Sequence, residues 1–222
     1  MEAPDPVVLD AVTPWAMQLA VHAEKTAPPA HSAVCAAAAT AVVRVVTAPD
    51  PEWREAVRRW ESDRIRKVAR RARGVRWAAV QDLPGITVES GGAEVRAFVP
   101  GPVTRVPPEL AKLQVAGLNL ADDDDHVSKP PEPPYAAIAL NPDVRMSTGK
   151  AAAQSGHAAH LLVRQSAEPG RSAWLAAGPR VHLERAKTWR RCVELATVAV
   201  RDAGFTEVPP GTMTAIGWLV LR

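Results

Sequence analysis

Three polar residues on one predicted helix are the first candidates for chemistry. Lys150, Gln154 and His157 stand at positions i, i+4 and i+7 of an alanine-rich run, so a helix places them on one face. Lys150 falls in the first turn, where the helix dipole disfavours a cation. An ammonium beside free N–H groups at a helix start is suited to binding an anion. The residues alone also allow a second interpretation, in which this stripe is an ordinary solvated helix face.

The sequence around the stripe predicts the elements that position it. Ala136–Leu140 is apolar throughout and predicts a buried strand, and Thr148–Arg164 predicts the helix that follows. Ser147 and Thr148 are candidate N-caps, and Gly149 allows a tight turn into the helix. The other elements predicted in this half are Pro179–Glu184, Ala186–Val198, Val198–Arg201 and Thr214–Leu221. Strands interleaved with helices indicate an α/β fold.

Two motifs follow one another in the second half of the chain. The first runs Gly149-Lys-Ala-Ala-Ala-Gln154-Ser-Gly-His157-Ala158, with Asp143 and Met146 before it. The second is Asp202-Ala-Gly-Phe-Thr206, followed by Pro210-Gly-Thr-Met-Thr214. In this order and at this distance, the two motifs resemble the signature of type 2 peptidyl-tRNA hydrolases. The resemblance covers the chain from about Tyr135 to its C-terminus.

The resemblance implies a compact α/β domain with a mixed four-stranded sheet, usually dimeric, with no metal or organic cofactor. It implies as substrate the ester bond between a peptide and the 3′ end of tRNA. The residues that match the family's catalytic positions are Lys150, Asp202, Thr206 and Thr214. Those that match its substrate-binding positions are Gly149, Gln154 and His157. One departure is Asn141, which stands where family members often carry a basic residue.

The matched residue types are suited to ester hydrolysis by water. Asp202 is the candidate base that positions the water and partly removes its proton. Lys150, paired with Asp202, would orient the carboxylate and stabilise the oxyanion or a terminal phosphate. Threonine hydroxyls would hold the water or the ester in line. The sequence has no Ser-His-Asp order and no nucleophile elbow, which favours attack by water over an acyl-enzyme intermediate.

A weak repeat links the two halves of the chain. At an offset of 119 positions, the strand-like Met17–His22 falls beside Ala136–Asn141, and Thr87 falls on Thr206. The offset indicates an internal duplication, with two unrelated α/β stretches as the alternative. The first-half residues at the positions of Lys150, Gln154, His157 and Thr214 are His31, Cys35, Ala38 and Val95, while Asp82 and Thr87 retain their types. Residues 15–102 are therefore predicted to be a catalytically inactive copy that packs on the active half as a built-in partner.

The predicted fold class is α/β, with two similar domains, each a mixed, roughly four-stranded sheet flanked by helices. Residues 1–118 would form the degenerate, non-catalytic domain and residues 135–222 the catalytic domain. Between them, residues 119–134 predict a stiff, solvated linker rich in Pro and Asp. A short helix, Pro107–Gln114, precedes this linker. The expected assembly is a monomeric pseudo-dimer rather than a homodimer.

Basic residues are concentrated before the middle of the chain. They are Arg64, Arg66, Lys67, Arg70, Arg71, Arg73 and Arg76. Ile65, Val68 and Ala72 recur at helical spacing, which predicts a helix with the arginines on its opposite face, whereas the repeat would favour a strand here. The candidates for contacts with the tRNA backbone are Arg66, Arg70 and Arg73. A charged outer helix face is the alternative.

The composition permits a polyanionic partner without requiring one. The net charge is +3 and the sequence pI is about 9.1. The two cysteines, Cys35 and Cys192, lack metal-type spacing and fit a reducing compartment. Met1–Pro14 lacks the basic start of a secretory signal, and no run of about 20 apolar residues could span a bilayer. We expect a cytoplasmic protein with no cofactor and no membrane partner.

Three functions are compatible with these features. The leading hypothesis is hydrolysis of the ester between a peptide, or an N-blocked aminoacyl group, and tRNA, which recycles the tRNA. The second is a non-catalytic tRNA- or RNA-binding protein that retains the hydrolase fold. The third is a protein-interaction role for the first half, which would require an exposed apolar patch. The presence of all four candidate catalytic residues favours the enzyme, because a binding protein does not need the complete set.

Overall fold

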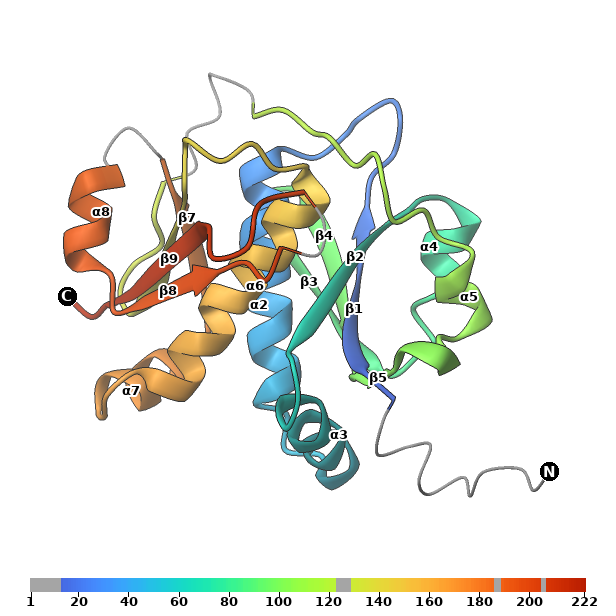
Figure 1. The fold of residues 1–222 in the computed structure, drawn as a ribbon, viewed down its shortest axis with the longest axis horizontal. Helices are drawn as coiled ribbons and strands as arrows, with labels where there is room; N and C mark the ends of the chain where they lie inside the picture. Colours follow the sequence, from blue (N-terminus) through green and yellow to red (C-terminus); the bar gives the residue numbers. More distant parts are fainter. Residues whose placement is uncertain (1–12, 123–128, 186–188, 205–206) are drawn as a thin grey trace.

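Two mixed β-sheets enclose a pair of long helices in this α/β protein (Figure 1). The structure is a computed structural model that describes residues 13–122, 129–185, 189–204 and 207–222. The central helices are α2 (His31–Val46) and α6 (Thr148–Gln165), and they pack directly on each other. Helix α2 also contacts strands of both sheets, and so does α6. The two halves of the chain therefore share one interior.

The first sheet has the strand order β2-β1-β4-β3. Its strands are β1 (Trp15–His22), β2 (Arg66–Ala72), β3 (Gly85–Ser90) and β4 (Ala93–Phe98), with a short β5 (Gly101–Pro102) paired to the start of β1. Strand β1 is parallel to β2 and antiparallel to β4, and β3 is antiparallel to β4. Strand β2 is thus an edge strand of this sheet.

The second sheet has the strand order β7-β6-β9-β8. Its strands are β6 (Tyr135–Leu140), β7 (Val181–Glu184), β8 (Val198–Arg201) and β9 (Met213–Val220). Strand β6 is parallel to β7 and antiparallel to β9, and β8 is antiparallel to β9. The strands predicted for this half from the sequence are confirmed, with boundaries that differ by a few residues.

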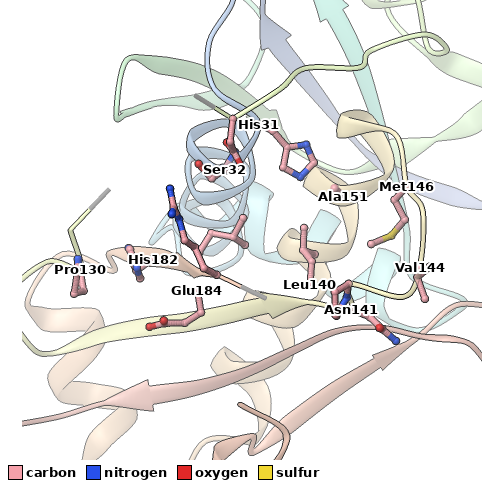
Figure 2. A pocket seen from close by; sticks show the side chains of 14 residues that line it. His31, Ser32, Pro130, Leu140, Asn141, Val144, Met146, Ala151, His182 and Glu184 are labelled. Atoms are coloured by element: carbon pink, nitrogen blue, oxygen red, sulfur yellow. The ribbon is translucent and has the colours of Figure 1, made fainter. Parts of the chain in front are cut away.

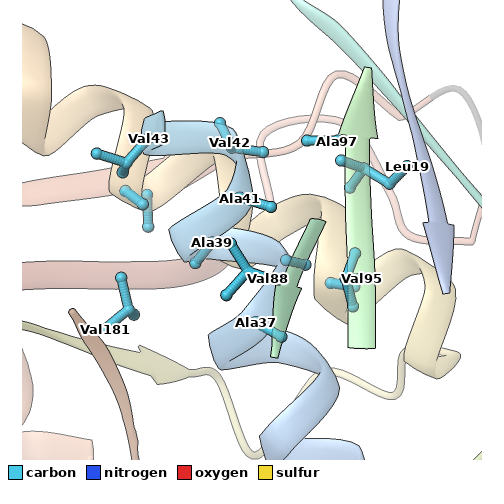
Figure 3. Close-up of a cluster of buried hydrophobic side chains, with 14 of the residues drawn as sticks. Leu19, Ala37, Ala39, Ala41, Val42, Val43, Val88, Val95, Ala97 and Val181 are labelled. Atoms are coloured by element: carbon cyan, nitrogen blue, oxygen red, sulfur yellow. The ribbon is translucent and has the colours of Figure 1, made fainter. Parts of the chain in front are cut away.

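Small residues bring the two central helices close together. Helix α2 consists largely of alanine and valine, and nearly all of its residues are buried. A Cβ at Gly156 of α6 would lie 3.0 Å from Val42 Cγ2 on α2, so glycine permits this close approach. Figure 3 shows α2 side chains between Val88 and Val95 of the first sheet and Val181 of the second. One buried apolar cluster extends across both sheets.

Shorter helices surround the two sheets and the central helices (Figure 1). They are α3 (Pro51–Glu61), α4 (Val75–Ala79), the 3-10 helix Val103–Arg105, α5 (Pro108–Ala111), α7 (Gly170–Ala176) and α8 (Trp189–Leu195). Helix α5 is the short helix predicted within Pro107–Gln114. Among the described residues no single helix is long and apolar enough to cross a membrane, and α2 and α3 meet that criterion only together, as a pair bent by 111°.

The predicted helix around Ile65–Ala72 is wrong, because this segment forms strand β2 beside β1. Its side chains alternate: Lys67 and Ala69 face α6, while Arg70 points to the other face and bonds Gln18. Apolar residues at positions 65, 68, 69 and 72 fit a helical period, but pairing with a buried neighbouring strand overrides local periodicity. The strand that the repeat favoured is the one that forms.

The start of the predicted linker is packed rather than freely solvated. Thr148 N–H donates to Leu118 O at 2.8 Å, and Leu120 N–H donates to Thr148 Oγ1 at 2.9 Å. Asp122 Oδ1 accepts from Ser32 N–H at 2.7 Å, so this carboxylate caps α2. The segment therefore closes over the N-termini of both central helices. The division of the chain into two domains at residues 119–134 stays a prediction.

Candidate active site

Residues far apart in the sequence meet where the N-terminal part of α6 faces the end of β8. Lys150 Nζ forms an ion pair with Asp202 Oδ2, and Gln154 Nε2 donates to the same oxygen at 2.7 Å. The Lys150 and Asp202 side chains are only 12% and 8% exposed. The predicted common face of Lys150, Gln154 and His157 is confirmed, since all three line one cavity.

A closed loop after β8 holds Asp202 in place. Its backbone N–H donates to Thr212 O at 2.9 Å, and its carbonyl accepts from Gly211 N–H at 2.7 Å. Gly204 N–H donates to Asp202 Oδ1 at 2.8 Å. Gly204 has φ +80°, and a Cβ there would lie 2.5 Å from the Pro210 ring, so only glycine fits. The loop thus fixes both the backbone and the carboxylate of Asp202.

A β-bulge turns Thr214 toward α6. In the β8–β9 ladder Val200 pairs with Ala215 and Arg201 pairs with Met213, which leaves Thr214 as the extra residue. Thr214 Oγ1 donates to Gln154 Oε1 at 2.9 Å, and the Thr214 side chain is completely buried. This contact fixes the orientation of the Gln154 amide, so that its NH₂ group faces Asp202.

The first turn of α6 is held by a pair of residues, one of which the sequence did not indicate. Ser147 is the N-cap, as predicted, and its Oγ accepts from Lys150 N–H at 3.2 Å. Glu207 accepts two hydrogen bonds from Ser147, from N–H at 2.7 Å and from Oγ–H at 2.6 Å. An acidic residue at a helix N-terminus also matches the helix dipole. The sequence feature that could have pointed to Glu207 is its position directly after Thr206 in the second motif.

The cavity has a volume of about 560 Å³ and draws its walls from both halves of the chain. Helix α6 supplies Lys150, Gln154 and His157, and the end of β8 leads to Asp202. The opposite wall is the start of β2, including Lys67, whose Nζ lies 3.1 Å from His157 Nδ1. Lys67 was not predicted as a site residue, because the helical interpretation of this segment placed it among basic residues of an outer helix face.

The predicted substrate-binding residues are divided between several places. Gly149 is buried at the start of α6, where an added Cβ would lie 3.6 Å from the Ala69 side chain. Arg66 lines the cavity. Arg70 instead donates to Gln18 and to the Leu113 carbonyl on the other face of the sheet. Arg73 lies in a separate pocket. Thr206 lies outside the described residues.

The surroundings of Asp202 and His157 determine the charge of these two side chains. Burial raises the pKa of Asp202, but hydrogen bonds from Lys150, Gly204 N–H and Gln154 outweigh it and leave the pKa below its ordinary value. Burial lowers the pKa of His157 well below its usual range, and the nearby positive charges of Lys67, His160 and Lys150 lower it further. At neutral pH the cavity therefore holds a carboxylate and a neutral imidazole.

A second cavity of about 480 Å³ lies at the N-terminus of α2. Figure 2 shows His31 at the start of α2, with Asn141 and Met146 from the loop before α6 and His182 from β7 around the same space. His31 Nδ1 lies 3.0 Å from Thr148 Oγ1. The residue predicted to correspond to Lys150 is thus bound to the start of α6. Among the described residues no three His, Cys, Asp or Glu side chains form a metal-binding group.

Comparison with known proteins assigns a family to the half of the chain that holds Lys150 and Asp202. The family model for peptidyl-tRNA hydrolase PTH2 matches residues 135–219. A peptidyl-tRNA hydrolase of Pyrobaculum aerophilum is 38% identical over 93 residues, covering 36% of this chain and 78% of the relative. The chain belongs to the PTH2 family. A PTH2 relative from Haloquadratum walsbyi, a peptidyl-tRNA hydrolase, is 34% identical over 89 residues, covering 36% of this chain and 80% of the relative.

The PTH2 match coincides with the elements of the second sheet. It begins at β6 and ends within β9, so it contains α6, the loop after β8 and the Thr214 bulge. The resemblance first seen in the two sequence motifs is confirmed for this part of the chain. Residues 1–134 lie outside the match, and with them the β2 wall of the cavity. The PTH2 domain therefore forms its cavity together with a segment that carries no family assignment.

Proposed function

We propose that the protein hydrolyses the ester bond between tRNA and a peptide or N-blocked aminoacyl group. The observation that carries this proposal is the connected set Lys150–Asp202–Gln154–Thr214 within the PTH2 domain. Each member bonds the next, and Lys150, Asp202 and Gln154 line a cavity open to a substrate, with Thr214 buried behind Gln154. The relatives named above are peptidyl-tRNA hydrolases, which supports the same substrate class here.

The two oxygens of Asp202 have different surroundings. Oδ2 accepts from Lys150 and Gln154, whereas Oδ1 accepts from Gly204 N–H. We assign the attacking water to the remaining lone pair of Oδ1, where the carboxylate orients it and takes its proton as charge develops. The Lys150 ammonium then stabilises the tetrahedral oxyanion. Thr206 remains a predicted contributor to this step.

The direct test is deacylation of N-acetyl-aminoacyl-tRNA by the wild type and by Lys150→Met and Asp202→Asn. We expect both variants to lose about 10²–10⁴-fold in kcat, since each removes a group that acts on the reacting atoms. Lys112→Met, which alters an exposed lysine at the end of α5, serves as the matched control. Unchanged turnover in Lys150→Met would refute the mechanism. Absent hydrolysis with salt-sensitive tRNA binding would favour the RNA-binding alternative.

We further propose that basic residues on the first half contact the tRNA backbone. Arg66 supports this, because it lines the cavity at the start of β2, where its part-exposed ion pair with Asp63 could be exchanged for one with a phosphate. Arg73, in a pocket beyond the other end of β2, extends the positive charge away from the cavity. Arg70 is withdrawn from this role, because its guanidinium is engaged within the fold. Phosphate contacts of this kind make affinity fall steeply with salt.

The first half is proposed to be a degenerate copy of the PTH2 domain. The two sheets have the same strand order and the same parallel and antiparallel pairs. Trp60 Nε1 donates to Arg66 O at 3.0 Å, and Trp174 Nε1 donates to Arg180 O at 2.9 Å, again six residues further on. Helix α6 packs on β2 of the other sheet, as α2 packs on β7. These reciprocal contacts are what a two-fold related pair would make.

Strand register supports a counterpart of Asp202 other than Asp82, which stands 120 positions before it in the sequence. Val88 pairs with Val95 as Val200 pairs with Ala215, which aligns Ser90, rather than Asp82, with Asp202. A cavity of about 230 Å³ lies between α2, β7 and the end of β3. It is lined by Ala33, Thr40, Ser90 and Val181, among others. Glu89 and Lys129 also line this cavity, but in the described part of the chain they form no ion pair like that of Lys150 and Asp202.

If the first half acts as the partner, the complete chain needs no second copy. We expect the 222-residue protein to be a monomer of 23.7 kDa in light scattering at micromolar concentration. The first half already covers one face of the PTH2 domain, since α2 lies on α6 and β7. A stable dimer of the full chain would contradict the pseudo-dimer proposal.

A further inference from the structure

Among the basic residues of the first half that line the catalytic cavity, Lys67 contacts His157, and burial lowers the pKa of its amine well below the usual value. Lys67 extends from β2 toward α6, with its Cδ 3.3 Å from the point where a Cβ on Gly156 would lie. Its Nζ is 4.6 Å from the Trp60 ring centroid and 3.1 Å from His157 Nδ1. The absence of a side chain at Gly156 leaves room for the lysine stem. Lys67 is therefore held between α3 and α6, with its amine against the imidazole.

We infer that Lys67 is a positioning residue: it donates a hydrogen bond to His157 Nδ1 and thereby holds the ring in the tautomer that presents Nε2–H to the substrate. The inference rests on the proposed function. A neutral imidazole has one donor and one acceptor nitrogen, so a bond to Nδ1 decides which nitrogen carries the proton. The fixed side of the ring faces β2, and the rest of the His157 side chain borders the cavity.

The neighbouring groups favour a neutral ring. Lys150 and His160 lie on the same helix, and Lys67 faces His157 from β2. Glu61 on α3 is bonded to His160 and Arg164, which leaves no carboxylate in contact with His157 among the described residues. Burial and three basic neighbours lower the pKa of His157, as described above. Protonation of the ring is therefore opposed from each side.

The position of His157 indicates which part of the substrate it meets. His157 is seven residues from Lys150, and at about 1.5 Å per residue this is roughly 10 Å along the helix. The ester that reacts beside Lys150 and Asp202 is therefore too far away to bond His157. The Nε2–H donor would instead meet acceptor oxygens of the terminal nucleotides, either phosphate or ribose. Loss of this donor should raise KM and leave kcat nearly unchanged.

The kinetic test compares Lys67→Met with Lys112→Met on N-acetyl-aminoacyl-tRNA. Methionine keeps the stem but cannot donate to Nδ1, so the ring divides between its two tautomers and KM should rise by the factor by which the Nε2–H fraction falls, about twofold to tenfold. The kcat should stay within about twofold. Lys112→Met, the same substitution outside the cavity, should alter neither constant. A fall in kcat with unchanged KM would overturn the inference.

A double mutant tests whether Lys67 acts through His157. His157→Leu removes the donor itself, so adding Lys67→Met to it should raise KM no further. Effects that multiply would show that Lys67 binds substrate independently and would overturn the inference. Circular dichroism and thermal unfolding of each variant establish that the fold is retained before kinetics are compared.

A spectroscopic test is independent of activity. Nitrogen-15 shifts of the His157 ring should report the Nε2–H tautomer in the wild type and a mixture of tautomers in Lys67→Met. An Nδ1–H tautomer in the wild type, or no change in Lys67→Met, would overturn the inference. If the wild type fails to hydrolyse the substrate, the proposed function fails, while the tautomer measurement still decides the role of Lys67.

Discussion

Gln154 uses both ends of one amide group, and this makes it the central link of the site. Its NH₂ donates to Asp202, and its carbonyl oxygen accepts from Thr214. Because each neighbour requires one specific end, the amide has a single favourable orientation. The orientation of the Asp202 carboxylate therefore depends on a buried threonine that does not touch it. This dependence explains how a bulge in β9 contributes to the geometry around Lys150.

The lowered pKa of Asp202 predicts a specific pH dependence of stability. A carboxyl group whose pKa is lower in the folded state stabilises the fold above its unfolded pKa of about 3.9, and this contribution is lost as the pH falls through the folded value. The difference in Tm between wild type and Asp202→Asn should be constant from pH 5 to 7 and shrink below about pH 4. A difference that grows on acidification would contradict the ion pair with Lys150.

Sequence patterns predicted some residues of the site and missed others for a physical reason. The common face of Lys150, Gln154 and His157 follows from helix geometry and is confirmed by the cavity they line. Asp202 joined them only through the family motif, because no local pattern predicts contact across 52 residues. Lys67 was missed because its contact with His157 depends on how β2, in the first half of the chain, packs against α6 in the second half.

At the scale of elements, the segment Arg66–Ala72 shows where local patterns fail. Its apolar residues satisfy a helical period, yet its neighbour β1 offers a complete parallel ladder. The alternation that results sends Lys67 toward α6 and Arg70 toward Gln18, whereas a helix would have gathered the arginines on one surface. The elements of the PTH2 domain were easier to predict, because each long alanine-rich or alternating segment there fits one type of element, a helix or a strand.

The loop after β8 provides a paired prediction. Gly204→Ala would combine a left-handed backbone with a Cβ that overlaps Pro210, and should lower the free energy of unfolding by about 2–5 kcal/mol. Gly211→Ala, with φ +79° but open space around its Cβ, should cost only about 1–2 kcal/mol. Urea unfolding measures both. Activity should also fall more in Gly204→Ala, because this residue holds Asp202 Oδ1. Equal losses in the two variants would show that the Pro210 contact is unimportant.

At the scale of the whole molecule, the two halves are joined by more than a linker. The buried cluster contains Leu19 and Val95 from the first sheet, Ile138 and Ala215 from the second, and the small residues of both central helices. Separating the halves would expose the apolar faces of α2 and α6 together. The duplication hypothesis predicted two sheets of similar make-up that pack on each other. The sequence contained no pattern that identifies the residues of the shared interior, because they lie far apart along the chain.

The shared interior predicts a single unfolding event. In differential scanning calorimetry the full chain should show one transition, with equal calorimetric and van't Hoff enthalpies, since neither half retains a complete core without the other. Two separable transitions would show that the halves are stable independently and would favour the two-domain division drawn from the sequence.

The wall that β2 contributes to the cavity also has an evolutionary consequence. In a symmetric pair of identical chains, every substitution is made twice and must be tolerated in both places. Here β2 faces α6, while β7 faces α2 beside the smaller cavity. A substitution at Lys67 therefore alters one cavity alone, and Val181 on β7 can be substituted independently of it. Under the proposed duplication, joining the two copies in one chain removes the constraint of symmetry, so each wall can change by itself.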